Sequence, residues 1–148
     1  IIQNKNMKIA IGGDHAGYEY KNSLKKYIEE KGHEVEDFGS ATEESCDYPD
    51  IAHPLAESVE SGKNEIGIAI CGSGNGINMT LNKHQDIRSA LCWDPELASL
   101  ARQHNNANVL ALPSRFIDLD LAKRCVEAFL ENKFEGGRHQ RRVNKIKK

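Results

Sequence analysis

Short apolar runs alternate along this chain with longer stretches in which apolar positions recur at helical spacing. Four apolar runs predict β-strands at residues 8–13, 65–71, 87–93 and 107–112, and the alternating pattern of residues 33–39 predicts a weaker fifth strand. The stretches between and after them predict helices: 18–32, 47–62, 75–83, 94–104 and a last one from Asp118. Pro54 lies inside the second helix and is expected to shorten or kink it.

Strict alternation of strands and helices predicts an α/β domain with a mainly parallel sheet, because right-handed crossovers place helices on both faces. We expect the strand order 2-1-3-4-5, in which the first and third strands are neighbours at the switch point. Ligands bind at the carboxyl ends of strands at such a point. Asp14 and His15 follow the first strand, and Cys71 ends the third, so both clusters are expected to face one pocket.

Composition narrows the possibilities further. The chain has 148 residues and a formal net charge of −2, which gives no reason to expect nucleic-acid or membrane binding. Its four cysteines are scattered without a CxxC pair, which argues against a zinc site or a disulfide framework and favours a reducing cytoplasm. No secretory signal or membrane-spanning run is visible. We expect one domain over 7–148, preceded by an extension or expression remnant at 1–6.

The most informative stretch is ICGSGNGINM, residues 70–79. It lacks the lysine of a Walker loop, the GxGxxG spacing of a dinucleotide loop and the arginine of a phosphatase cysteine loop. The remaining interpretation is a loop whose backbone N–H groups bind an anion at a helix N-terminus, a position that lowers the pKa of the Cys71 thiol. The alternative is a buried structural cysteine beside a flexible turn.

Other polar clusters also have more than one interpretation. Asp14 could simply cap a helix, and His104 could be a cation at a helix C-terminus. Seven of the residues from 133 to 148 are Lys or Arg and one is Glu, which indicates a solvated basic tail, a nucleic-acid arm or a phosphate site. Guanidinium groups match the oxygens of a phosphate monoester, and no aromatic residue follows Phe134 to stack on bases.

Six segments in order carry a family resemblance: GGDHAG, DYPD, CGSGNGI, RQHNNANV, PSR and EGGRHQRRV. Together they resemble ribose-5-phosphate isomerase type B and its sugar-phosphate isomerase relatives, over nearly the whole chain from Met7. The resemblance implies a Rossmann-like three-layer α/β/α sandwich with a five-stranded sheet, assembled as a homodimer or dimer of dimers with shared active sites. It also implies cytoplasmic interconversion of ribose 5-phosphate and ribulose 5-phosphate in the pentose phosphate pathway, without metal or organic cofactor.

The resemblance also implies residue roles. Cys71 is expected to be the base, Ser73 to move protons between the two oxygens, His104 to open the sugar ring, and Asp14 to hold the ring oxygens. The expected substrate-binding residues are His15, Tyr48, Gly72, Gly74, Asn75, Gly76, Asn105, Arg115, Arg138, His139 and Arg142. Of these, Arg138, His139 and Arg142 are expected to reach into the site of the partner subunit.

Two alternatives stay open. One is an isomerase of a 6-phosphate hexose, galactose or allose 6-phosphate, although the galactose enzyme divides its motifs between two subunits and this chain holds the full set. The other is a non-catalytic sugar-phosphate-binding module. Two differences from relatives matter. Ile77 stands where another branch of the family has glutamate, which leaves Cys71 as the base in the loop. Pro113, ahead of Arg115, stands where relatives often have glycine.

Overall fold

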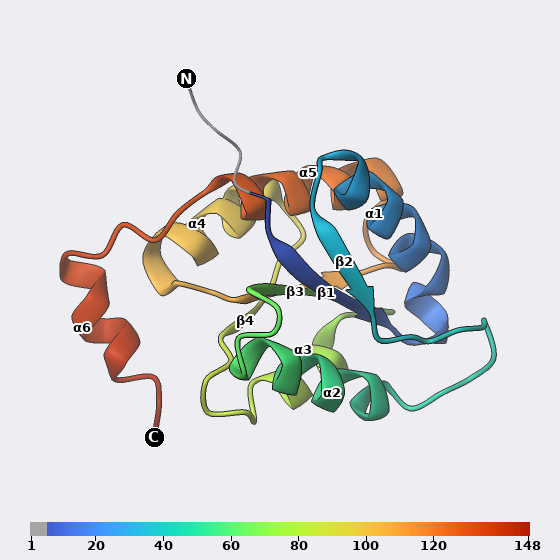
Figure 1. Cartoon of the computed structure of the whole chain (residues 1–148), viewed down its shortest axis with the longest axis horizontal. Coiled ribbons are helices and arrows are strands. Elements are labelled where there is room, and N and C mark those ends of the chain that lie inside the picture. The colour runs from blue at the N-terminus through green and yellow to red at the C-terminus, as the bar shows by residue number, and fades with distance from the viewer. Residues whose placement is uncertain (1–5) are drawn as a thin grey trace.

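The computed structural model describes residues 6–148 and contains a five-stranded parallel sheet between two helical layers (Figure 1). The predicted extension lies outside these residues apart from Asn6. The strands are β1 (Lys8–Gly13), β2 (Glu34–Asp37), β3 (Ile66–Cys71), β4 (Ser89–Leu91) and β5 (Val109–Pro113). The longer helices are α1 (Tyr18–Glu30), α2 (Tyr48–Glu60), α4 (Pro95–Asn105) and α5 (Leu119–Glu131). The shorter ones are η1 (His15–Gly17), α3 (Asn75–Leu81) and α6 (Arg138–Asn144).

Two hydrophobic clusters lie on opposite faces of the sheet. Isoleucines of β1 and β3 pack with α1, α4 and α5 on one face, whereas alanines of the same strands pack with α2 and α3 on the other. This arrangement follows from the pleat, because successive strand residues point to opposite faces. The predicted α/β sandwich is therefore confirmed, and α2 runs through Pro54 as one helix.

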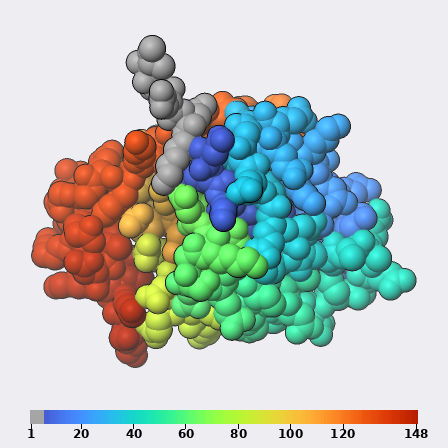
Figure 2. All heavy atoms as spheres, in the orientation of Figure 1, coloured from blue at the N-terminus to red at the C-terminus, as the bar shows by residue number. Residues whose placement is uncertain are grey.

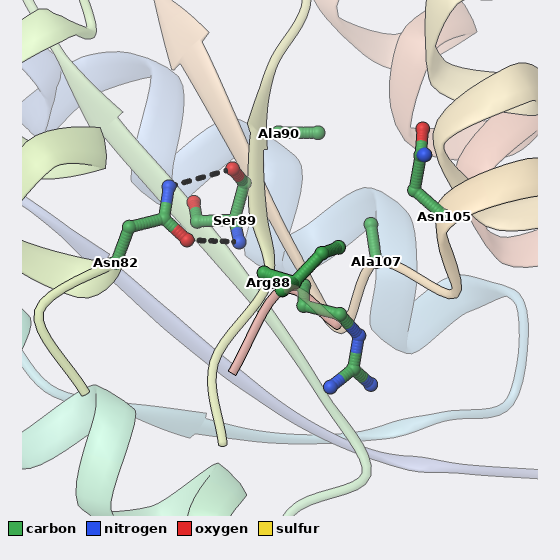
Figure 3. A pocket seen from close by; sticks show the side chains of 7 residues that line it. Asn82, Arg88, Ser89, Ala90, Asn105 and Ala107 are labelled. Carbon is green, nitrogen blue, oxygen red and sulfur yellow. Dashed lines mark hydrogen bonds between the residues drawn. The ribbon is translucent and has the colours of Figure 1, made fainter. Parts of the chain in front are cut away.

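The strand order was predicted wrongly: it is β2-β1-β3-β5-β4, with β5 inside the sheet and β4 at its edge. All five residues of β5 are buried, while the three residues of β4 are half-buried. A continuous apolar strand suits a position covered on both faces and both edges, and a short strand next to Arg88 suits an edge. The Asn82 side chain pairs with that edge, exchanging hydrogen bonds of 2.9 and 2.8 Å with the Ser89 backbone (Figure 3).

The basic C-terminal segment is partly helical, which the sequence analysis did not predict. Gly136 and Gly137 adopt positive φ angles of 69° and 55°, and α6 follows directly. His139 and Val143, one turn apart on α6, are its buried residues. The segment forms one end of the molecule, coloured red in the space-filling view (Figure 2). Among the described residues, no helix is both long and apolar enough to cross a bilayer.

Candidate functional site

The first group of predicted site residues gathers where β1 and β3 end side by side. Gly13 of β1 is in register with Ile70 of β3, and the Asp14 N–H donates to the Ile70 carbonyl at 3.2 Å. Because the strands are parallel neighbours, their carboxyl ends bring Asp14 next to Cys71. The predicted proximity of Asp14 and Cys71 is confirmed, and it did not depend on the misplaced β4.

Asp14 is a buried helix cap with a second contact. Its Oδ1 accepts hydrogen bonds from the N–H groups of Ala16 at 3.0 Å and Gly17 at 3.2 Å, at the start of η1. The capping interpretation is thus correct for this residue. The same carboxylate also lies near enough to Cys71 to raise the pKa of its thiol.

The Cys71 thiol is almost fully buried, with 5% of the residue exposed. Burial raises the pKa of the thiol above its ordinary value, and the backbone N–H groups of Ile77, Gly74 and Gly76 oppose this change by favouring the thiolate. The lowered pKa predicted from the sequence is wrong in sign, because desolvation outweighs the loop donors. Ile77 is itself a residue of α3, and its side chain is fully buried in the core.

The glycine loop has two positions where a side chain would collide. Gly74 has a φ of 76°, and a Cβ there would lie 2.4 Å from Leu91 Cδ1. A Cβ on Gly76 would lie 2.5 Å from Cζ of Tyr48, so the tyrosine ring rests directly on this glycine. The loop therefore brings Tyr48 of α2 against the start of α3, next to the thiol.

Two other predicted loop residues lie on the exposed side. The Ser73 hydroxyl accepts from the backbone N–H and the side-chain amide of Asn75, each at 3.3 Å. These contacts hold Ser73 and Asn75 together at the N-terminus of α3. Their exposure leaves both polar groups accessible to a ligand entering from the solvent side.

Arg115 reaches the same loop from β5. Pro113 is in register with Cys71, and the Arg115 N–H donates to the Gly72 carbonyl at 3.0 Å. A Cβ on Gly72 would lie 3.3 Å from Nη1 of this arginine. Proline at position 113 is therefore accommodated as the last residue of a strand, and the loop after it still brings the guanidinium to the glycine loop.

His15 is oriented by the backbone of a neighbouring loop. The Cys46 N–H donates to His15 Nδ1 at 3.3 Å. With Nδ1 acting as acceptor, the proton of the neutral imidazole resides on Nε2. His15 thus presents an N–H donor through its other nitrogen, the form suited to a phosphate oxygen.

The second group of predicted site residues lies around the C-terminus of α4. The rings of His104 and His139 stack with centroids 4.2 Å apart and planes 14° from parallel. Glu135 Oε1 lies 3.9 Å from His104 Nε2 and 3.7 Å from His139 Nε2. Arg138 and Arg142, on the same helix as His139, add positive charge. Glu135 was missed in the sequence analysis, where an exposed glutamate beside two glycines carries no signal.

His139 carries an unusual polar atom. Its Nε2 is buried and lacks a hydrogen-bond partner within the described residues. The pKa of His139 is lowered, first by desolvation and then by His104 and Arg138. A neutral imidazole whose nitrogen has no hydrogen-bond partner, with arginines nearby, is suited to form a hydrogen bond with an anionic or hydroxyl-bearing ligand from outside the chain.

These two groups lie at opposite ends of the parallel strands. The group around Cys71 lies at the carboxyl ends, here called the carboxyl edge, and the group around His104 lies at the amino ends, here called the amino edge. Since α4 runs back along the sheet, Asn105 lies at the start of β5, where Val109 is in register with Gly67, whereas Cys71 is in register with Pro113. The four residue steps along β5 amount to about 13 Å at about 3.3 Å each. One chain therefore does not bring His104 and Asn105 to the thiol.

A cavity opens beside Asn105. Its volume is about 290 Å³, and β4 and the loop after α4 bound it (Figure 3). Ile146, in the segment that follows α6, also lines it. The remaining lining residues are Asn82, Arg88, Ser89, Ala90 and Ala107. This cavity belongs to the amino-terminal edge of the sheet and contains none of the residues around Cys71.

Comparison with known proteins identifies the family. Residues 9–146 match the family model described as Ribose/Galactose Isomerase. The chain belongs to the ribose/galactose isomerase family. It is 46% identical over 139 residues to ribose-5-phosphate isomerase B of Escherichia coli, covering 94% of this chain and 93% of that protein.

Solved structures agree with this placement. Ribose-5-phosphate isomerase B of Clostridium thermocellum superposes with a TM-score of 0.94 at 47% identity, covering 95% of each chain. The enzyme of Mycoplasma genitalium, solved with bound ribulose 5-phosphate, has a TM-score of 0.90 at 41% identity, covering 94% of this chain and 93% of that one. The family resemblance stated from the sequence motifs is confirmed.

Proposed function

We propose that this protein interconverts ribose 5-phosphate and ribulose 5-phosphate through an enediolate, with the Cys71 thiolate as the base. The observation that carries the proposal is the thiol itself. It is buried beside Asp14 and faces backbone N–H groups of Gly74, Gly76 and Ile77. Relatives across nearly the whole chain are named ribose-5-phosphate isomerase B, which supports this substrate.

The reaction needs a base and an anion-stabilising group. Removal of the proton on C2 of the open-chain aldose leaves negative charge on the oxygen at C1, and the proton then returns to C1. Cys71 takes and returns this proton. The bare N–H groups of the glycine loop stabilise the enediolate oxygen, and the Ser73 hydroxyl passes the proton between O1 and O2.

The remaining roles require a second copy of the chain. We place His104 and Asn105, as well as Arg138, His139 and Arg142, in the site of a partner subunit, because they lie at the far edge of the sheet from Cys71. A homodimer with two-fold symmetry supplies both edges to each of two identical sites. His104 of the partner then opens the furanose ring, with Asp14 holding the ring oxygens.

The phosphate binds between the two edges. His15, through its Nε2–H, and Arg115 contribute from the thiol side, and the arginines of the partner's α6 contribute from the other. Tyr48, resting on Gly76, contacts the sugar. The unpartnered Nε2 of His139 acquires a ligand atom only in this shared site.

The test is an isomerisation assay with ribose 5-phosphate as substrate, in which the formation of ribulose 5-phosphate is measured. Allose 6-phosphate and galactose 6-phosphate are assayed as substrates in parallel. Ribose 5-phosphate is expected to have the highest kcat/KM. A higher value for a six-carbon substrate would move the proposal to the hexose reaction. Phosphate binding without turnover of any of the three sugars would support the non-catalytic binding module instead.

A further inference from the structure

A second histidine cluster lies on the helical layer formed by α2 and α3, and none of its members belongs to the two groups of site residues just described. His53 of α2 and His84, which follows α3, approach each other with Nδ1 of the first 2.8 Å from Nε2 of the second. His84 Nδ1 in turn lies 2.9 Å from Glu60 Oε1. We propose that His53 and His84 bind a divalent transition-metal ion of the zinc class.

The positions of the two nitrogens suit a shared ion. The ring planes are tilted by 52° with centroids 5.0 Å apart, so the rings are not stacked and their facing nitrogens point toward one another. Ligand atoms about 2.0–2.1 Å from a tetrahedral zinc ion are about 3.3 Å apart. An increase of about 0.5 Å in the distance between the two nitrogens, from the observed 2.8 Å, therefore makes room for the ion. His53 is exposed and can make this movement.

Glu60 prepares His84 as a ligand. A carboxylate only accepts hydrogen bonds, so His84 Nδ1 carries a proton, and in the neutral ring Nε2 presents its lone pair. Glu60 is itself held, because its Oε2 accepts from the Asp86 N–H at 3.2 Å. A carboxylate behind a histidine is the arrangement that orients metal-binding imidazoles and makes them more basic.

Metal binding then replaces one proton. In the neutral pair, His53 Nδ1–H donates to His84 Nε2, so a single proton joins the rings. The ion takes the place of this proton, which moves through solvent to His53 Nε2, and both facing lone pairs bind the metal. Glu57, exposed and one turn along α2 from His53, is placed to add a carboxylate oxygen, and water completes the shell.

The other histidine cluster is the natural comparison. The ligand atoms of His104, Glu135 and His139 all lie within 4.8 Å of one another. However, their imidazoles stack 14° from parallel, so the nitrogen lone pairs do not converge. Arg138 and Arg142 also add positive charge beside His139. Around the His53 pair the acidic groups Glu57, Glu60 and Asp86 are present, although Asp86 is paired with Lys147 at 2.9 Å.

An ion at this site joins two helices that begin beside the Cys71 thiol. α2 begins at Tyr48, and α3 begins directly after Gly74. Imidazole ligands favour Zn²⁺, Ni²⁺ and Cu²⁺ over Mg²⁺ and Ca²⁺. Because the ion binds only the folded chain at these paired positions, it raises the melting temperature.

The test is a calorimetric titration of the metal-free protein with Zn²⁺, and with Mg²⁺ for comparison, together with thermal melts. The wild type is expected to bind one Zn²⁺ per chain at this site and to melt at a higher temperature with Zn²⁺. His53→Gln is expected to weaken that binding at least tenfold and to abolish the melting shift. Circular dichroism without metal checks that this exposed substitution leaves the fold intact.

Two control variants locate the ion. His104→Gln disables the other histidine cluster, and Cys46→Ser removes the half-exposed thiol. Both are expected to retain the binding and the melting shift of the wild type. The proposal is overturned if His53→Gln binds Zn²⁺ as the wild type does, if either control loses the ion, or if no variant binds it. Imidazole nitrogen chemical shifts provide a separate readout, because both His53 and His84 must change on binding.

Discussion

The two edges of the sheet are built in different ways. At the carboxyl edge, the chemistry is buried and made largely of backbone: a thiol 5% exposed, a capping carboxylate and a glycine loop. At the amino edge it consists of side chains on helix ends, where His104 stacks on His139 beside the arginines of α6. The carboxyl edge is suited to stabilise a reacting anion, and the amino edge is suited to bind a ligand through exposed side chains.

This difference explains why one chain holds a full set of motifs without a full site. Parallel topology fixes Cys71 at the carboxyl end of β3. Because α4 runs back along the sheet, His104 lies at the amino edge, before the start of β5. No side-chain movement spans a separation of about 13 Å along β5. In the homodimer we propose, two copies related by a two-fold axis would present one edge of each kind to the other and so complete two equivalent sites.

The largest effect is expected from removing the base at the carboxyl edge. Cys71→Ala should lower kcat by about 10²–10⁴-fold, the usual contribution of a general base. Phosphate binding should change little, since the thiol is not a phosphate ligand in the proposed site. Steady-state kinetics and inorganic phosphate titration measure the two quantities, and near-wild-type turnover by Cys71→Ala would place the base elsewhere, with Asp14 as the first residue to examine.

A smaller effect is expected at the amino edge. Arg142→Ala removes a charge-assisted contact to phosphate, so KM should rise by about 10–100-fold while kcat changes much less. Arg142 is exposed on α6, so the melting temperature should stay the same. Arg141→Ala, a neighbouring exposed arginine outside the predicted site, is the matched control and should leave KM unchanged. Equal effects of both substitutions would mean that α6 contributes only diffuse charge.

The glycine loop allows the backbone cost to be separated from the packing cost. Gly74→Ala places a Cβ at positive φ and 2.4 Å from Leu91 Cδ1, so unfolding free energy should fall by more than the about 1–2 kcal/mol expected for the backbone alone. Gly62→Ala has a φ of 82° with nothing within 4 Å, and it should show the backbone cost only. Urea denaturation compares the two, and equal losses would remove the packing argument.

The smallest effect is the pH dependence of the thiol. Since burial and Asp14 raise the pKa of Cys71, little thiolate exists at neutral pH, and kcat/KM should increase as pH rises toward the raised pKa. Alkylation of Cys71 by iodoacetamide should accelerate over the same range. Cys92 and Cys125, whose pKa values burial raises to about 12 and about 11, should stay unmodified. A flat profile between pH 7 and 9 would show that the loop donors outweigh desolvation.

Local patterns in the sequence were sufficient for the strands, the long helices and the cluster around Cys71, because each depends on neighbouring residues. They were not sufficient for the position of β4. The order of β4 and β5 depends on which of the two strands the helical layers cover, and this is a property of the packed fold. α6 was missed because seven residues do not form a stable helix alone, and it is held through His139 and Val143. The raised pKa of Cys71 depends on burial that only the packed fold determines.

The shared site is tested most directly by mixing two inactive variants, Cys71→Ala and His104→Asn, after dissociating and reassembling the chains together. In a mixed dimer, one site carries both substitutions and the other carries neither. Random pairing at equal amounts makes half of the dimers mixed, so about a quarter of wild-type activity should return. If Cys71 and His104 served the same site within one chain, every site would remain defective and the mixture would stay inactive.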